Sequence, residues 1–460
     1  MALTRAFVDG LRHRLGSEYV LQDAETLAAH AADAFGVGHL PQVVVRPGDT
    51  AAVAAVATLC HEHRVPLVVR GAGTGYTGGA VPVAGGVVLS VERLDRILAV
   101  DTDNLLVVVQ PAVITAELQR AAERVGLFYP PDPASLDQCS IGGNVAECAG
   151  GPRAFKYGTT KRYVLALEAV LPTGEVVRTG SKAVKNVVGY DLTQLLVGSE
   201  GTLAIVTEAT LRLVPKPPAR AALSAFFSDI RGAVAGVTAV IHAGVVPAAL
   251  ELVDEESLRA VEAFVGESVA PAGAGALVIV ECDGMPASVE EEIAAVHAAV
   301  TSAGALAVVR ARGEAERERV WFVRRQLSYA LRATGAHKIN HDVAVPRGRV
   351  PDLFDEVERV RQTHDLRMAC FGHAGDGNIH VNILIDKNDA EEVRRSKVAE
   401  REIFQRVVAL EGSITGEHGV GFTKSRHLDL ELSPEVIALS KRVKRAFDPR
   451  GILNPGKIFP

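Results

Sequence analysis

Residues 70–79 read Arg-Gly-Ala-Gly-Thr-Gly-Tyr-Thr-Gly-Gly, and they follow an apolar, strand-like run over 66–70. Gly73-x-Gly75-x-x-Gly78 matches the dinucleotide-binding fingerprint of doubly wound folds, in which the glycine loop opens a helix. Turn and strand residues follow here over 81–86, so no helix is expected. Successive backbone N–H groups of such a loop still hold anions, and the five glycines therefore indicate a ligand loop rather than a surface turn.

The sequence on either side of this glycine loop alternates short strands with turns. A helix is expected from Asp49 to Cys60, and the first forty residues also show a helical pattern. Few long helices separate the strands, which favours an α+β fold over a doubly wound sheet. Strands are expected over 42–46, 66–70, 86–90, 105–110, 164–171, 176–179 and 201–214.

A break in the pattern lies at Pro215-Lys-Pro-Pro218, which can continue neither a helix nor a strand. Beyond this segment the chain alternates strands with longer helices, which predicts a second α+β domain with an antiparallel or mixed sheet. The expected strands are 222–227 and 277–282, and the expected helices are 230–242, 288–303, 320–332 and 350–363.

The composition excludes several classes of protein. The 460 residues carry 49 Lys and Arg against 55 Asp and Glu, a net charge of −6 that favours neither nucleic acid nor an anionic membrane as a partner. No apolar run reaches the roughly 18 residues of a transmembrane segment, and the first residues do not read as a signal peptide. The five scattered cysteines form no CxxC pair, which excludes the usual iron–sulfur cluster or zinc ribbon and fits a reducing cytoplasm.

Three further segments carry glycine-rich, ligand-suited chemistry. A rigid proline turn over 130–135 leads into the stretch 140–151, where Ser140 and Asn144 add hydrogen-bonding groups. The stretches 186–192 and 197–206 follow. Each segment alone is a weak signal, but the four in this order between residues 70 and 206 are a strong one.

These segments carry a resemblance to a known family. The vanillyl-alcohol oxidase/p-cresol methylhydroxylase (PCMH) superfamily has an FAD-binding domain that is similar to Arg70-Gly-Ala-Gly-Thr-Gly, Pro131-Asp-Pro-Ala-Ser, Ile141-Gly-Gly-Asn-Val-Ala and Gly198-Ser-Glu-Gly-Thr-Leu-Ala-Ile-Val. Within it, the chain resembles the D subunit of glycolate oxidase and the FAD-linked D-lactate and D-2-hydroxyglutarate dehydrogenases. The likeness extends from about residue 42 to the C-terminus.

The resemblance implies an α+β protein with a two-subdomain PCMH-type FAD-binding domain and a ferredoxin-like α+β substrate (cap) domain. The FAD-binding domain is expected over residues 1–217, and the substrate domain with a metal site over 218–420. Residues 421–460 are expected to return to the FAD-binding domain.

The resemblance also implies which residues hold the cofactor. The glycine loop is expected at the pyrophosphate, residues 131–146 at the isoalloxazine and ribityl chain, and residues 200–206 at the adenine end. The glycine loop contains neither His nor Cys, so non-covalent FAD is expected. Cys148 stands where relatives often have Asn. The expected FAD-binding residues are Arg70, Gly71, Ala72, Gly73, Thr74, Gly75, Tyr76, Thr77, Pro131, Asp132, Ser135, Ser140, Ile141, Gly142, Gly143, Asn144, Ala146, Glu200, Gly201, Ile205, Val206 and Asn454.

Residues 371–382 form the most specific chemical motif, with two histidines on either side of an Ala-Gly-Asp-Gly turn. His373 and His380 would face opposite sides of one continuous strand, but the turn allows both to converge, with Asn382 on the His380 face. Glycines also bracket Glu417-His418 downstream. Two histidines and a carboxylate form a common open metal site. Isolated histidines such as His242 are more often satisfied core or surface residues.

In the resembling family, His373, His380 and Glu417 match ligands of a divalent metal (Zn, Mn or Fe), and His418 matches the catalytic base. Arg324 matches an arginine that grips the substrate carboxylate, a task that suits a guanidinium. Arg325 adjoins it, so this assignment depends on the resemblance and not on spacing. Lys338 and Asn382 are further catalytic candidates, although a solvated lysine is an equally good interpretation of Lys338.

The resulting hypothesis is FAD-dependent oxidation of a short 2-hydroxy acid, glycolate or D-lactate, to the 2-oxo acid. Electrons would pass to a non-oxygen acceptor, such as an iron–sulfur partner subunit, an electron-transfer flavoprotein or a quinone. The alternatives are a D-2-hydroxyglutarate dehydrogenase and a catalytically silent FAD-binding subunit of a larger complex. The expected protein is cytoplasmic, at most peripheral to the inner face of the membrane through a partner, and able to form a homodimer.

Overall fold

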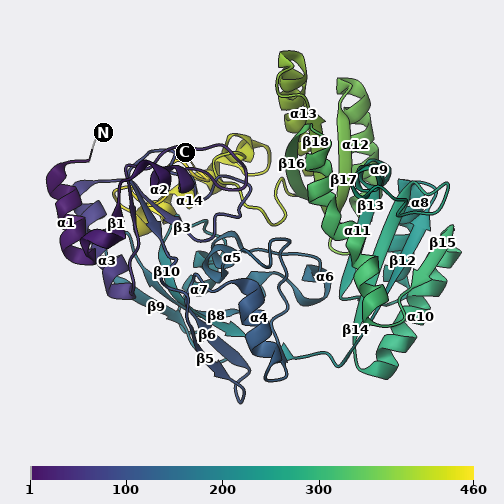
Figure 1. The fold of residues 1–460 in the computed structure, drawn as a ribbon, viewed down its shortest axis with the longest axis horizontal. Helices are drawn as coiled ribbons and strands as arrows, with labels where there is room; N and C mark the ends of the chain where they lie inside the picture. Colours follow the sequence, from purple (N-terminus) through teal and green to yellow (C-terminus); the bar gives the residue numbers. More distant parts are fainter. Residues whose placement is uncertain (1–2, 460) are drawn as a thin grey trace. The chain divides into compact units, whose positions relative to one another are not determined.

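The computed structural model describes residues 3–459, which divide into two compact units (Figure 1). The first unit contains the chain up to Gly150, the segment Thr159–Lys216 and the chain from Glu417 onward. The second unit contains Gly151–Gly158 and Pro217–Gly416. No helix within residues 3–459 combines the length and apolar character needed to cross a lipid bilayer.

The first unit contains a four-stranded sheet of short, valine-rich strands in the order β1-β2-β4-β3. Strands β2, β4 and β3 are parallel, and β1 pairs antiparallel with β2. Helices α1 and α3 bury one face, and Leu27 of α2 packs on the other, so all of β2 and β4 is buried. The bounds are α1 (Arg5–Leu15), β1 (Val20–Leu21), α2 (Ala24–Ala29), β2 (Val43–Val45), α3 (Thr50–His63), β3 (Leu67–Arg70) and β4 (Val87–Ser90).

A second, antiparallel sheet of the first unit has the strand order β5-β6-β10-β8-β9. Helices α4, α5 and α7 pack against its strands, and β7 pairs with β11 beside it. The bounds are β5 (Ile97–Asp101), β6 (Leu106–Val109), α4 (Thr115–Glu123), β7 (Leu127–Phe128), α5 (Ile141–Glu147), β8 (Val164–Val170), β9 (Val176–Gly180), α7 (Leu192–Leu196), β10 (Ile205–Arg212) and β11 (Val214–Pro215).

Two sequence-based expectations for this unit are wrong in part. The first forty residues are not helical throughout, because Gly16 ends α1 with φ 96° and residues 31–40 contain no helix or strand. The strand expected from residue 201 begins only at Ile205. Glu200 and Gly201 adopt left-handed backbone (φ 52° and 62°), which belongs to a turn and not to a strand.

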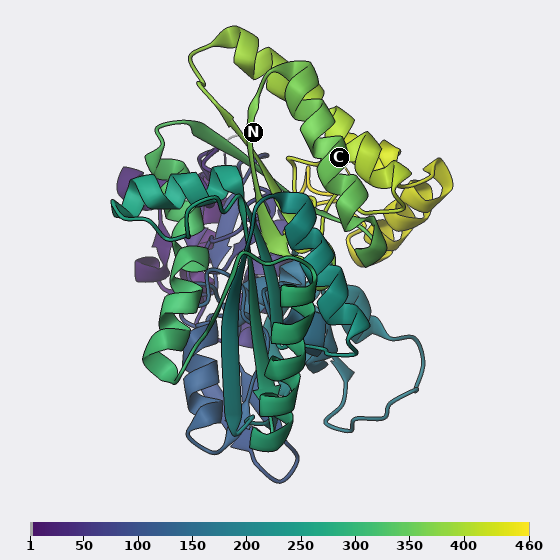
Figure 2. The same cartoon turned by 90° about the vertical axis from the view of Figure 1, so that its right-hand side faces the viewer.

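The second unit is built on a seven-stranded antiparallel sheet with the order β15-β12-β14-β13-β17-β18-β16. Helices α8 and α10 cover one face, and α9 and α11 cover the other (Figure 2). The bounds are β12 (Ala219–Phe227), α8 (Ile230–His242), β13 (Ala249–Asp254), α9 (Glu255–Val265), β14 (Ala276–Gly284), α10 (Pro286–Ser302), β15 (Ala307–Arg310), α11 (Glu314–Ala333), β16 (His337–Ala344), β17 (Arg367–His373) and β18 (Asn378–Ile385).

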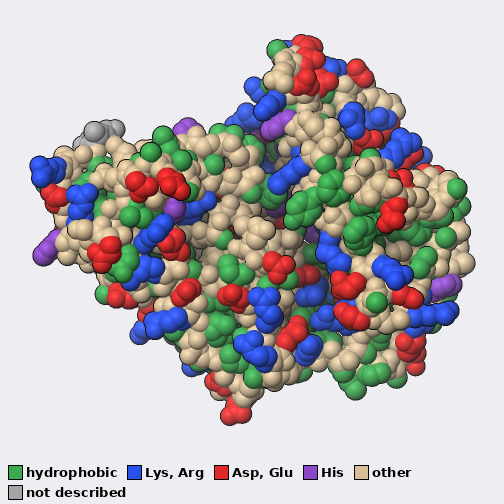
Figure 3. Space-filling model, in the orientation of Figure 1, with side chains coloured by type: hydrophobic (Ala, Val, Ile, Leu, Met, Phe, Trp, Pro, Cys, Tyr) green, Lys and Arg blue, Asp and Glu red, His purple; other side chains and the backbone are tan. Residues whose placement is uncertain are grey.

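Helices α12 and α13 pack against each other beside this sheet (Figure 1). The remaining helices are α6 (Ala154–Tyr157), α12 (Val350–His364), α13 (Ala390–Ala409), α14 (Pro434–Phe447) and the 3-10 helices Ser17–Tyr19, Thr160–Arg162, Arg347–Arg349 and Ser425–Leu430. Acidic and basic side chains are interspersed over the face seen in Figure 3, in keeping with the small net charge.

A loop over residues 181–191 connects β9 to α7 and exposes apolar side chains. Asn186 orders it internally, because its Nδ2 donates to Ser181 Oγ (3.4 Å) and its Oδ1 accepts from the backbone N–H of Val188 (3.1 Å). Val187, Val188 and Tyr190 nevertheless remain 96%, 91% and 95% exposed. Such a cluster is unusual for a protein surface that has no partner.

Candidate active site

After Arg70, the last residue of β3, the glycine loop contains neither helix nor strand. Gly73 and Gly78 have left-handed backbone (φ 72° and 77°), which glycine adopts without strain. A Cβ atom on Gly71 would lie 2.5 Å from Ser140 Oγ, so the loop packs directly against the start of α5. The glycine loop and the stretch 140–151 therefore meet. Their close-packed, side-chain-free backbone fits a phosphate-bearing cofactor such as FAD.

Asp33 is a residue beside this loop that sequence reasoning missed. Its buried carboxylate accepts the backbone N–H of Phe35 (3.0 Å), and Arg70 Nη1 donates to the neighbouring carbonyl of Ala32 (2.7 Å). Burial raises the pKa of Asp33, against the backbone N–H groups of Phe35 and Gly78 and the charge of Arg70. It lies in a segment with a helical sequence pattern, which gave no signal of a site.

The expected cofactor residues 140–146 form the helix α5. Ser140 begins it by accepting the N–H of Gly143 at Oγ (3.4 Å), and Asn144 Nδ2 donates to Thr115 Oγ1 (2.6 Å). The segment 197–206 binds the same helix, because the N–H groups of Gly198 and Glu200 donate to backbone carbonyls of α5 (2.9 and 2.8 Å). Three of the four glycine-rich segments thus converge within the first unit.

The proline turn before α5 is held by a side chain of α4. Gln119 Nε2 donates to the backbone carbonyl of Pro131 (2.9 Å), and Pro131 is buried. Downstream, Ile205 is buried in the core of the first unit, while Val206 is partly accessible. The structure therefore places some of the expected cofactor residues in the packing that supports the glycine-rich loops.

His418, the expected base, also lies against the glycine loop. Its ring stacks on Tyr76, with ring centroids 5.4 Å apart and an interplanar angle of 25°. Its backbone carbonyl accepts Thr77 Oγ1 (3.2 Å), and its Nε2 lies 4.0 Å from Glu417 Oε1. The loop over 417–422, which we term the base loop, is therefore attached to the loop expected to bind FAD.

In the second unit, His373 ends β17 and His380 lies in β18, joined by the tight turn over 374–377. The strand register pairs Phe371 with His380 and His373 with Asn378, so both histidines point to one face of the sheet. Their buried rings are 5.5 Å apart between centroids. The turn therefore brings the two imidazoles together.

Glu251 of β13 joins this histidine pair and was missed by sequence reasoning. One carboxylate oxygen lies 2.6 Å from His373 Nδ1, and the other accepts Arg324 Nε of α11 (2.5 Å). Burial of this fully enclosed carboxylate would raise its pKa. The charges of His373 and Arg324 outweigh burial and lower the pKa of Glu251 to about 2. An ionised Glu251 therefore fixes both side chains.

Arg324 and Arg325 have different surroundings. Arg324 uses Nε for Glu251 and lies over the Phe371 ring (4.9 Å), which leaves its two Nη groups as donors for an anion. Arg325 binds Glu318 on its own helix (2.9 Å) and is half-exposed. The geometry supports Arg324 over its neighbour as the anion-binding arginine.

Lys338 and Asn382 lie on the same face of the sheet as His380. Lys338 Nζ donates to Ser328 Oγ (3.0 Å), and burial, with the charges of Arg332 and Arg324, lowers the pKa of Lys338 to about 8. Asn382 Nδ2 donates to the backbone carbonyls of Ala369 and His380 (3.0 and 3.2 Å). Its buried Oδ1 has no hydrogen-bond partner within residues 3–459. It is therefore an acceptor available to a ligand.

Glu417 stands where the chain leaves the second unit, bonded to Gly416. The N–H of Gly416 donates to Asp342 Oδ2 (2.9 Å), and a Cβ on Gly416 would lie 2.1 Å from Asn378 Nδ2. Ligand atoms of His373, His380 and Glu417 lie within 4.8 Å of one another. Two imidazoles and a carboxylate at this spacing suit a divalent cation.

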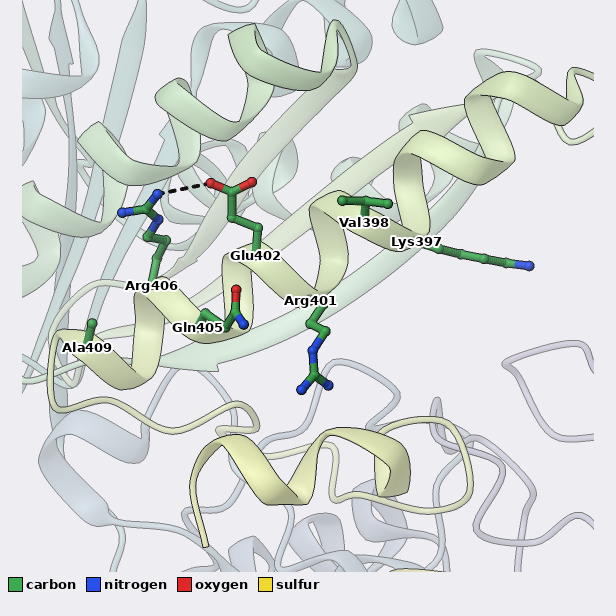
Figure 4. A pocket seen from close by; sticks show the side chains of 7 residues that line it. All are labelled: Lys397, Val398, Arg401, Glu402, Gln405, Arg406 and Ala409. Carbon is green, nitrogen blue, oxygen red and sulfur yellow. Dashed lines mark hydrogen bonds and ion pairs between the residues drawn. The ribbon is translucent and has the colours of Figure 1, made fainter.

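A separate groove of 510 Å³ runs along α13 and is lined by Lys397, Val398, Arg401, Glu402, Gln405, Arg406 and Ala409. Glu402 accepts Arg406 Nη2 (3.1 Å) on one side of the helix, and Arg401 points to the other side (Figure 4). None of the expected site residues lines this groove.

Two family models match the chain. The FAD binding domain matches residues 41–180, and the C-terminal domain of FAD linked oxidases matches residues 216–458.

Similar proteins include glycolate oxidase subunit GlcD of Bacillus subtilis, which is 42% identical over 91% of this chain and 89% of that protein. D-lactate dehydrogenase of Anaerostipes hadrus is 38% identical over 91% and 89%. The structure of p-cresol methylhydroxylase superposes with a TM-score of 0.82 at 18% identity, covering 99% of this chain and 98% of that one. This likeness confirms the expected PCMH-type α+β fold.

Proposed function

The chain belongs to the FAD-linked oxidases and is an FAD-dependent oxidoreductase, and we propose that it oxidises a short 2-hydroxy acid, glycolate or D-lactate, to the 2-oxo acid. The observation that carries the proposal is the buried Glu251–Arg324–His373 arrangement. It presents guanidinium donors beside two imidazoles, which suits a molecule with a carboxylate next to a hydroxyl group.

Arg324 binds the substrate carboxylate through its Nη groups. Glu251 holds Nε, so the planar guanidinium is oriented before the substrate arrives and two parallel hydrogen bonds can form. Lys338 adds a second positive charge near Arg324, because its Nζ reaches Ser328 of the same helix. Asn382 offers its unpaired Oδ1 to a donor on the substrate or a bound water.

The glycine loop, α5 and the segment after Gly198 would hold FAD, and no covalent bond is expected because residues 70–79 contain no His or Cys. Bound FAD supplies the acceptor for the hydride that leaves the substrate α-carbon. The backbone N–H groups of the loop and Arg70 would bind the pyrophosphate charge.

His418 accepts the proton of the α-hydroxyl at Nε2, the ring nitrogen near Glu417. An imidazole suits this role because its ordinary pKa lies near neutral pH. Stacking on Tyr76 fixes the plane of the ring, so the accepting nitrogen keeps its direction during turnover.

His373, His380 and Glu417 would hold a divalent cation, Zn, Mn or Fe. Glu251 accepts from Nδ1 of His373, which leaves the other ring nitrogen as the ligand atom, a pairing usual behind metal-bound histidines. A bound cation would make the α-hydroxyl proton easier to remove.

We infer that electrons leave through a separate protein, an iron–sulfur partner subunit or an electron-transfer flavoprotein, with a quinone as the alternative acceptor. The support is that the five cysteines are free thiols without cluster spacing, and that the relative in Bacillus subtilis is named a subunit. We place the partner on loop 181–191, whose apolar side chains lie beside Lys182 and Lys185 and would fit an apolar patch with acidic groups.

The test is a dye-reduction assay of the purified holoprotein with glycolate, D-lactate, L-lactate and D-2-hydroxyglutarate, with and without a chelator. We expect glycolate or D-lactate to reduce the dye, and the chelator to suppress the rate. A preference for D-2-hydroxyglutarate would instead assign Lys338 to a second carboxylate. No reduction with any of the four acids would refute the proposal.

A further inference from the structure

The base loop is held by a buried carboxylate on a distant part of the first unit. Both oxygens of Glu200 accept backbone N–H groups of this loop, from Val420 at 2.7 Å and from Gly421 at 2.6 Å. These two residues come directly after Gly419, next to His418 in the chain. The Glu200 side chain is buried, and each of its carboxylate oxygens is bound by one N–H group of the base loop.

This arrangement is costly, which argues that it has a role. Glu200 has left-handed backbone (φ 52°), a conformation that a residue with a Cβ rarely adopts and that concentrates at functional sites. Burial raises the pKa of its carboxyl, against the N–H groups of Val420 and Gly421 and the charges of Lys457 and Lys424. An apolar side chain would fill the same space without the desolvation penalty.

The C-terminal segment ties Glu200 to the glycine loop. Asn454, also left-handed at φ 43°, donates from Nδ2 to the backbone carbonyls of Gly79 (2.9 Å) and Glu200 (2.8 Å). Lys457 Nζ donates to the carbonyl of Val81 (2.6 Å) and to Asn454 Oδ1 (2.9 Å). Buried Lys457 and Asn454 therefore bridge the glycine loop and the peptide of Glu200.

The glycine loop also holds the base loop directly. Thr77 donates from Oγ1 to the carbonyl of His418 (3.2 Å), and its own carbonyl accepts the N–H of Phe422 (3.1 Å). A Cβ on Gly421, where φ is 53°, would lie 2.0 Å from the Thr77 carbonyl oxygen. Only glycine permits this approach, so the base loop is bound on one side by Thr77 and on the other by Glu200.

We propose that Glu200 is a positioning residue that, with Asn454 and Lys457, holds the base loop in register with the glycine loop. The inference rests on the proposed role of His418 as the base. Its consequence is that FAD binding and base placement are coupled, because the loop that receives the cofactor carries the contacts that fix His418. Filling the glycine loop should order the base loop as well.

The experiment compares Glu200→Gln with wild type as FAD-loaded protein. Gln presents an NH₂ group to one of the two amide donors, so that hydrogen bond is lost and the loop shifts. A displacement of about 1 Å costs about 100-fold in rate, and we expect that loss in kcat with KM changed less than about twofold. Hydrogen exchange at Val420 and Gly421 should become faster, and wild-type exchange there should slow when FAD is added.

Glu168→Gln is the matched control. Glu168 is a second buried carboxylate of the first unit, bound by Thr50 Oγ1 (2.7 Å), Thr207 Oγ1 (3.1 Å) and Arg178 Nη2 (2.5 Å). Its substitution should lower thermal stability and leave kcat and base-loop exchange unchanged. If Glu200→Gln does not fold, Asn454→Ala is measured instead, for kcat and for hydrogen exchange of the base loop.

Unchanged exchange at Val420 and Gly421, or faster exchange with wild-type kcat, would overturn the positioning role. Failure of the proposed function has a different signature. It would be seen as wild-type activity in His418→Asn, while the exchange comparison would still decide whether Glu200 holds the base loop.

Discussion

The two sets of candidate catalytic groups are supported in different ways. His373, His380 and Arg324 stand on regular elements, β17, β18 and α11, where strand register and helix packing fix their directions. His418 stands in a loop without helix or strand and depends on hydrogen bonds from Thr77 and through Glu200. Removal of a single supporting contact should therefore act on the first set through stability and KM, whereas at the second set it should lower kcat.

The largest expected effect is at His418 itself. His418→Asn removes the proton acceptor, and general-base catalysis typically contributes about 10²–10⁴-fold to the rate. We expect kcat to fall by that factor while the protein keeps its flavin absorbance. Steady-state kinetics with glycolate and D-lactate, together with a spectrum of the purified variant, measure both. Retained turnover would remove His418 from the mechanism.

The next effect tests the groups that stand on regular strands and helices. Glu251→Gln leaves Arg324 and His373 without their shared anion, and breaking a buried pair of this kind costs about 3–5 kcal/mol of folding free energy. Activity should fall through a raised KM, since Arg324 loses its orientation. Denaturant unfolding and substrate titration are the measurements.

Glu281→Gln is the control for this variant. Glu281 lies on the neighbouring strand β14 and accepts Trp321 Nε1 (2.8 Å), outside the Glu251–Arg324–His373 arrangement. Its substitution should leave KM near the wild-type value. Equal effects of the two substitutions would show that the whole face, and not Glu251, carries the binding energy.

A smaller effect concerns pH. Because the pKa of Lys338 is lowered to about 8, its ammonium is present below that pH and lost above it. KM for the 2-hydroxy acid should rise as the pH passes through about 8 in the wild type. Lys338→Arg, which stays charged, should show no such rise. A KM that climbs equally in both proteins would assign the titration to another group.

The smallest effect on chemistry is expected at loop 181–191. Val187→Asp and Val188→Asp change highly exposed side chains, so stability should stay within about 0.5 kcal/mol and dye reduction should be unchanged. Reduction of the protein acceptor should fall. Val125→Asp is the control, because Val125 is 46% exposed and lies elsewhere on the first unit. Unchanged transfer to the acceptor would move the partner to another surface.

The sequence predicts those parts of the site that lie within short segments. The glycine loop and the histidine motif could be found because their chemistry is contained in about ten consecutive residues each. Glu251 could not, since it meets His373 across 122 positions and Arg324 across 73. Glu200 accepts the N–H of Gly421 across 221 positions. No local sequence pattern could therefore predict that Glu200 binds the base loop. Pairing between distant segments depends on strand register and loop packing, which one sequence does not display.

The helices and strands were likewise predictable only where a local sequence pattern determines them. Long periodic segments such as α8 were expected with their observed bounds, because hydrophobic spacing alone determines them. The N-terminal region was not, since glycine-dependent turns at Gly16 and beyond interrupt its helical pattern.

One measurement tests the central proposal most directly: the absorbance of the bound flavin under anaerobic conditions after addition of glycolate or D-lactate. We predict that one of these acids bleaches the oxidised flavin in the wild type. In His418→Asn the bleaching should be slower by about 10²–10⁴-fold. Flavin that stays oxidised in the wild type with both acids would contradict the assignment of this chain as a short 2-hydroxy acid dehydrogenase.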